Sequence, residues 1–188
     1  MTKYLYKNKW VSLKQTSKGF VYGERRNVNS TASLLFKKEN NNYKFLLRYQ
    51  PLPELKLIDT NKMKWSTLYP CCVTGSMEKN EIPIDNVIKE VLEETNYIVS
   101  KKDIKDFNIV VSSTQMNECV YNFIIDITNA KRLNKKEGDG TFFENISKNK
   151  WVSHNTLKKI LLSDKSIHLS SLASCYLLFD SYINKNKA

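Results

Sequence analysis

The chain has 188 residues, of which 41% are hydrophobic, and a formal net charge of +11 at pH 7. This length fits one domain, or one domain with a small extension, and the apolar content is sufficient for a buried core. No run of about eighteen apolar residues is present, which excludes a transmembrane helix, and the first residues lack the apolar stretch of a signal peptide. We therefore expect a cytoplasmic protein with no membrane partner.

The basic residues are mostly lysines scattered among asparagines, a pattern typical of an AT-rich coding sequence, so nucleic acid is an unlikely partner. The four cysteines lack Cys-x-x-Cys spacing, and Cys71-Cys72 lies in an apolar run. This indicates buried free thiols in a reducing compartment. With only two histidines in the chain, we do not expect a zinc site.

In chain order, the residues before position 29 predict a β-hairpin, with two apolar-aromatic runs at 10–13 and 19–22 around a Lys-Gly turn. Further strands are expected from their β-branched and aromatic content, and two amphipathic stretches near the C-terminus predict helices. The residues at 54–64 and 129–142 are polar enough for loops. The expected strands are 33–36, 44–49, 65–74, 107–114, 119–128 and 150–153, and the expected C-terminal helices are 155–162 and 169–182.

One stretch carries the chemistry. Gly75 is followed by Glu81 and then by Glu90, Glu93 and Glu94 on a helix expected to begin at Pro83 and end near residue 95. Glutamates spaced by three and four residues on a helix lie close enough to repel one another. A hard divalent cation removes that repulsion, and clustered carboxylates suit Mg²⁺ or Mn²⁺.

This spacing resembles the box of the Nudix hydrolases, Gly-x5-Glu-x7-Arg-Glu-U-x-Glu-Glu-x-Gly-U, where U is a bulky apolar residue. Lys89 stands at the position of the box arginine and keeps its charge without the rigid bidentate fork. Asn96 replaces the second glycine, a mild change because Asn tolerates the left-handed conformation. Ile82 takes the place of a capping Ser or Thr, which gives the helix a poorer start.

The resemblance extends to ADP-sugar (ADP-ribose) pyrophosphatases over most of the chain, through short matches at 8–13, 138–146 and 167–176. It implies an α/β (α+β) fold, the Nudix α/β/α sandwich with a mixed β-sheet. An N-terminal β-hairpin subdomain at 1–28, for dimerisation and adenine binding, would precede a Nudix domain at 29–188. It also implies a homodimer in which the N-terminal strands of one protomer reach the partner's active site.

The resemblance implies roles for individual residues. Glu90, Glu93 and Glu94 correspond to metal ligands for Mg²⁺ or Mn²⁺, and Glu81 to a supporting catalytic glutamate. Several acids remain open as the general base, because Thr141 stands where related enzymes have a loop glutamate; a box glutamate such as Glu93 is one alternative. The other candidate bases are Asp139 and Glu144, and the substrate contacts would be Trp10, Tyr22, Arg25, Arg26, Arg48 and Glu118.

The function these residues imply is metal-dependent hydrolysis of the pyrophosphate bond of a nucleoside diphosphate sugar. The expected reaction converts ADP-ribose to AMP and ribose 5-phosphate. Two alternatives stay open: a Nudix hydrolase of oxidised nucleotides or dinucleoside polyphosphates, and a non-catalytic Nudix-fold binding module. The intact glutamates at 81, 90, 93 and 94 favour an enzyme over the binding module.

Overall fold

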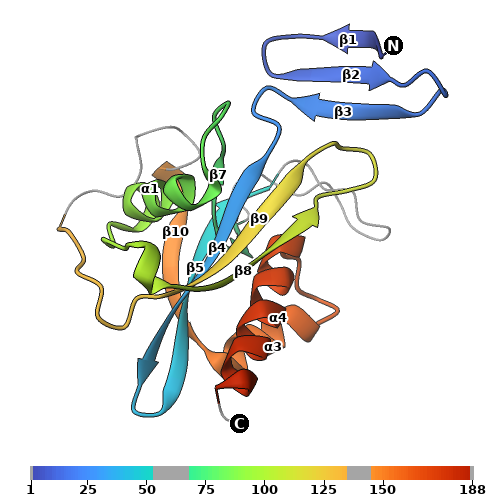
Figure 1. Cartoon of the computed structure of the whole chain (residues 1–188). Coiled ribbons are helices and arrows are strands. Elements are labelled where there is room, and N and C mark those ends of the chain that lie inside the picture. The colour runs from blue at the N-terminus through green and yellow to red at the C-terminus, as the bar shows by residue number, and fades with distance from the viewer. Residues whose placement is uncertain (1, 53–67, 135–144, 187–188) are drawn as a thin grey trace.

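The protein is described by a computed structural model that covers residues 2–52, 68–134 and 145–186. A large mixed β-sheet forms the body, and a small antiparallel sheet stands to one side of it (Figure 1). The helices lie against the two faces of the large sheet. This arrangement confirms the α/β sandwich expected from the sequence.

The large sheet has seven strands, with β10, β5, β4, β9 and β8 hydrogen-bonded in that order. Strand β4 is central, because it pairs in parallel with β9 and antiparallel with β5 and β7. Strand β6 pairs with the C-terminal end of β5, from Arg48 to Pro51. The strands are β4 (Ser30–Glu39), β5 (Asn42–Pro51), β6 (Leu68–Cys71), β7 (Val73–Ser76), β8 (Ile104–Val111), β9 (Cys119–Asp126) and β10 (Lys148–Ser153).

Successive residues of β4 face opposite sides of the sheet, and each side has its own core. Leu34 and Phe36 pack with α3 (His154–Leu162) and α4 (Ser170–Lys185). Leu35, on the opposite side, packs with Val87 and Val91 of α1 (Pro83–Thr95). Figure 1 shows α1 on one side of the sheet and α3 and α4 on the other.

The ends of α1 follow from its sequence. Ile82 is the residue before the first turn and provides no side-chain cap, while Pro83 occupies the first turn. At the other end Asn96 adopts the left-handed conformation with φ of 61°, and its N–H donates to the carbonyl of Leu92. Both expectations for this helix, the poor start and the asparagine stop, are confirmed.

The N-terminal segment forms three strands, the two of the expected hairpin and one more before them. They are β1 (Lys3–Lys7), β2 (Val11–Gln15) and β3 (Val21–Arg25). The third strand is joined to the body by the loop at 113–118. There the N–H of Gly23 donates to the carbonyl of Gln115 at 2.7 Å, and the Asn117 amide donates to Glu24 at 2.6 Å. The small sheet is therefore anchored through β3.

The single strand expected at 65–74 is two strands, β6 and β7, within the described residues. The chain changes partner from β5 to β4 between them, at Cys72. This residue, Cys71 and Cys175 are all fully buried and free. Burial raises the pKa of Cys71 to about 12 and that of Cys72 well above its usual value, so both stay protonated. The expectation of buried thiols is confirmed.

Most of the large apolar side chains of α4 pack into the core. Phe179 is fully buried, and Tyr176 and Tyr182 pack around the same cluster. Leu177 alone of the aromatic and leucine residues on α4 is strongly exposed, at 68%. No helix in the described part of the chain is both long and apolar enough to cross a membrane.

Candidate functional site

Gly75 lies directly against the carboxyl group of Glu90. Strand β7 pairs with β4 so that Gly75 is opposite Thr31, and α1 crosses above it. A Cβ atom built on Gly75 would overlap the Cγ, Cδ and Oε1 atoms of Glu90. The glycine is therefore required for space, because only a residue without a side chain lets the helix glutamate lie on the strand. This explains physically why a glycine precedes these carboxylates.

Glu94 is almost fully buried and forms an ion pair with Arg48 of β5. The distance from Arg48 Nε to Glu94 Oε2 is 3.3 Å, and the side chains are 4% and 12% exposed. The backbone of the same residue is held as well, because the amide of Asn149 donates to the Glu94 carbonyl at 2.7 Å. Lys89, by contrast, is exposed. The cation beside the helix carboxylates thus comes from a strand of the sheet.

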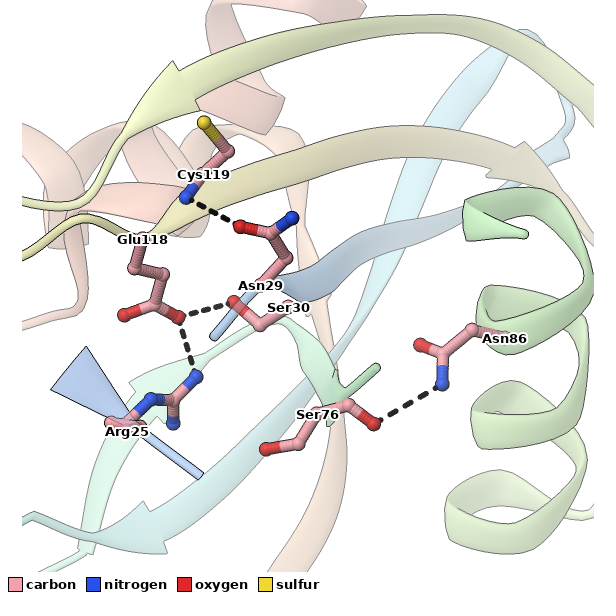
Figure 2. A network of polar contacts seen from close by, with 7 residues as sticks. All are labelled: Arg25, Asn29, Ser30, Ser76, Asn86, Glu118 and Cys119. Carbon is pink, nitrogen blue, oxygen red and sulfur yellow. Dashed lines mark hydrogen bonds and ion pairs between the residues drawn. The ribbon is translucent and has the colours of Figure 1, made fainter. Parts of the chain in front are cut away.

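Glu81 joins the loop after β7 to the start of α1. Its Oε2 atom accepts hydrogen bonds from the Glu78 N–H at 2.8 Å and from the Asn86 amide at 2.9 Å. Asn86 is fully buried and donates to the Ser76 carbonyl at 3.3 Å (Figure 2). It also accepts from the Thr31 hydroxyl at 2.6 Å. Glu81 and Asn86 together hold β4, β7 and α1 in register beside Glu90.

Glu93 is exposed on α1, so the three helix glutamates are in three different environments. Within residues 2–52, 68–134 and 145–186 no three Asp, Glu, His or Cys side chains converge closely enough to hold a metal ion. Glu90 and Glu94, one helical turn apart, are the two carboxylates associated with the strands. Mg²⁺ is commonly bound by one or two carboxylates and completed by waters and substrate phosphates. The carboxylate oxygens of Glu90 and Glu94 fit such an ion, and the contact with Gly75 positions the first of them.

A cavity of about 380 Å³ opens beside Gly75. Arg25 and Glu118 line it and form an ion pair of 2.6 Å, and Glu118 also accepts from the Ser30 hydroxyl at 2.7 Å (Figure 2). The side chain of Glu118 is 12% exposed and that of Arg25 is 39% exposed. Two of the expected substrate contacts, which are 93 residues apart in the sequence, are therefore brought together here.

Trp10 and Arg26 are placed at a second, adjoining cavity of about 440 Å³, which Arg25 and Ser76 also line. Trp10 is 63% exposed, so its ring is available to a ligand. Tyr22 pairs with Lys14 on β2, about 13 Å along the strand from Trp10 at the usual rise per residue. The two aromatic side chains are too far apart to hold one base between them within a single protomer.

Of the remaining candidates, Arg48 is 3% exposed and contacts Glu94. Asp139 and Glu144 lie outside the described residues, as does Thr141. Sequence reasoning missed the Arg48–Glu94 pair, the role of Asn86, and the approach of the α4 N-terminus to the cavity at Leu169, Ser170 and Ser171. Only Asn86 had a local signal, as a polar residue on the apolar side of a helix.

No protein-family model and no curated protein sequence matches the chain. Solved structures do match. A crystal structure of an ADP compounds hydrolase superposes with a TM-score of 0.62 over 100% of this chain and 95% of that one, at 10% identity. A NUDIX hydrolase from Nitrosomonas europaea has a TM-score of 0.53 over 81% of this chain and 88% of its own, at 14% identity. The chain therefore has the Nudix fold.

Proposed function

We propose that the protein is a metal-dependent hydrolase of the pyrophosphate bond in a nucleoside diphosphate sugar, with ADP-ribose as the substrate. The observation that carries this proposal is the contact between Glu90 and Gly75. It brings a helix carboxylate against Gly75, which lines a cavity together with Arg25. Carboxylates for a cation next to a guanidinium for phosphate form the pair of features that a diphosphate needs.

In this proposal the diphosphate lies across Gly75. Glu90 and Glu94 hold a Mg²⁺ or Mn²⁺ ion, which supplies charge neutralisation and a bound water of lowered pKa. Arg25 binds phosphate oxygens on the cavity side, and Trp10 stacks on the adenine. Water adds its oxygen to one phosphorus, the bridging P–O bond breaks, and the products are AMP and ribose 5-phosphate. Glu93, Asp139 and Glu144 remain the candidates for accepting the proton of the water.

The test is a hydrolysis screen over nucleotide sugars, oxidised nucleotides and dinucleoside polyphosphates, each with Mg²⁺, with Mn²⁺ and with EDTA. We expect metal-dependent release of AMP, fastest from ADP-ribose. If another nucleotide is hydrolysed faster, the assignment of ADP-ribose as the substrate is wrong, while the proposed metal-dependent hydrolysis stands. Absence of hydrolysis from every compound would refute the enzyme and favour a binding module, an alternative supported by the exposed Glu93 and the lack of a three-ligand cluster in the described residues.

We also propose that the protein is a homodimer joined through the small sheet. Large apolar side chains of the small sheet and of the turn before β3 are exposed to solvent: Tyr4 51%, Leu5 44%, Tyr6 57%, Leu13 40% and Phe20 50%. A partner copy would cover them and would bring a second set of aromatic side chains towards Trp10. Because the apolar residues Leu172, Phe179 and Ile183 of α4 are buried within the protomer, the dimer surface would be formed by the small sheet rather than by that helix.

A further inference from the structure

Helix α4 begins at the cavity beside Gly75. Leu169, Ser170 and Ser171 line that cavity, and Leu169, which precedes the first turn, offers no side chain to cap it. In the described part of the chain, the backbone N–H groups of Ser170 and Ser171 have no hydrogen-bond acceptor. A sixteen-residue helix therefore presents free N–H groups and the positive end of its dipole to this space.

Several polar atoms around the same cavity have no hydrogen-bond partner in the described part of the chain. Ser171 is only 8% exposed, and its hydroxyl has no hydrogen-bond partner among the described residues. The Oγ atom of Ser112 and the Nε atom of Arg25 are also buried and unpaired there. Buried polar groups in folded proteins are nearly always hydrogen-bonded. The two buried atoms Ser112 Oγ and Arg25 Nε, together with the free hydroxyl of Ser171, therefore indicate a ligand that supplies the acceptors.

The unpaired groups at this cavity can all donate hydrogen bonds, which favours an anion as the ligand. Arg25 Nε and the helix N–H groups can only donate hydrogen bonds, and the two serine hydroxyls can donate as well. One carboxylate, Glu118, lines the cavity and opposes an anion, but its Oε1 atom already accepts from Arg25 and from Ser30 (Figure 2). Five groups at this cavity can donate to a ligand: Arg25 Nε, two helix N–H groups and two serine hydroxyls. Tetrahedral oxyanions are the usual ligands of helix N-termini.

We propose that this end of α4 binds a phosphate group, namely the phosphate of the diphosphate substrate that is farther from the α1 carboxylates. The assignment rests on the proposed function for the identity of the ligand, but it does not require hydrolysis. It makes the protein selective for two linked phosphates, since one is held at α1 and the other at α4. We call this the α4 phosphate site; its residues are Arg25, Ser112, Ser170 and Ser171.

The experiment is a calorimetric titration of the full chain with inorganic pyrophosphate in EDTA, so that no metal contributes. The test variant is Ser170→Asp, because Ser170 is exposed at the first turn of α4 and a carboxylate there favours the helix dipole. A structural role for Ser170 therefore predicts an unchanged or higher melting temperature and unchanged binding. The α4 phosphate site predicts binding weaker by at least about tenfold, from charge repulsion at close range.

Asn155→Asp is the matched control. Asn155 is exposed in the first turn of α3, so the variant adds the same charge at a helix N-terminus away from the cavity. We expect it to bind pyrophosphate as the unmodified chain does. Ser171→Ala, which removes a hydroxyl and adds no charge, should weaken binding several-fold.

The proposal is overturned if the unmodified chain does not bind pyrophosphate in EDTA, or if Ser170→Asp and Asn155→Asp bind it equally well. Failure of the proposed function is a separate result. A chain that hydrolyses no nucleotide, yet binds pyrophosphate in a manner sensitive to Ser170→Asp, would retain the α4 phosphate site without the enzyme. If the chain hydrolyses ADP-ribose and Ser170→Asp does not change the rate, the proposed hydrolase function stands and the α4 phosphate site is refuted.

Discussion

Replacing Gly75 by alanine should lower the hydrolytic activity while leaving the stability of the fold nearly unchanged. The backbone at Gly75 is not in the left-handed region, so alanine is compatible with its conformation. The added Cβ, however, overlaps the carboxyl group of Glu90. The flexible glutamate side chain can move away while β7 and α1 stay in place. We therefore expect Gly75→Ala to fold normally and to lose the position of Glu90.

The magnitudes differ for the two properties. Non-bonded carbon atoms need about 3.5–4.0 Å, so the Glu90 carboxyl must shift by more than about 1 Å. A displacement of that size at a reacting centre can cost about 100-fold in rate. The free energy of unfolding should change by less than about 1 kcal/mol, because the rotamer strain of Glu90 and the reduced entropy of the unfolded chain have opposite signs.

The assay measures kcat/KM for ADP-ribose with Mg²⁺ and the urea midpoint for Gly75→Ala, Glu90→Ala and the double variant. Since Glu90→Ala vacates the space, Gly75→Ala should add almost nothing to it. Gly23→Ala is the comparison for crowding alone: its Cβ would approach the sulfur of Met116 at 2.8 Å rather than a glutamate of α1. Full activity in Gly75→Ala, or additive losses in the double variant, would refute the reasoning.

Four further outcomes are expected. Glu94→Gln should abolish metal-dependent hydrolysis and, because it breaks a buried ion pair, lower the free energy of unfolding by about 3 kcal/mol in urea titration. Arg48→Met should destabilise to a similar extent, and the double variant should lose less than the sum; additive losses would contradict the pairing. Trp10→Ala should weaken ADP-ribose binding by about 1–3 kcal/mol without changing pyrophosphate binding. Sedimentation at micromolar concentration should give a dimer; a single 21.9 kDa species would contradict it.

Local patterns in the sequence predicted what local physics determines. The boundaries of α1 follow from Pro83 and Asn96, two residues whose backbone preferences act within a single turn. Strand β5 ends at Pro51, whose ring leaves no N–H to donate to a neighbouring strand. The two faces of the sheet follow from alternation along β4, which places Leu34 and Leu35 in different cores. These features need no information about distant residues.

Features set by distant contacts were not predictable in this way. The apolar run at 68–76 is one stretch in the sequence, yet it divides where its neighbour changes from β5 to β4. Lys3–Lys7 has only five residues and buries none of their side chains, so no core-facing pattern marks it as a strand; β2 provides its antiparallel partner. The ion pair of Arg25 with Glu118 depends on β3 meeting the loop at 113–118. In each case the partner is supplied by the fold.

The cation beside the helix carboxylates is an example that bears on the chemistry. Read locally, Lys89 is the only basic residue next to Glu90, and its weak match to an arginine suggests a less well-oriented site. In the fold Lys89 is exposed, and Arg48 reaches the buried Glu94 from β5. A guanidinium remains charged under all ordinary conditions and offers a planar set of donors. The replacement of the arginine at position 89 therefore need not weaken the site, because a strand 41 residues earlier supplies the charge at the carboxylate that the helix buries.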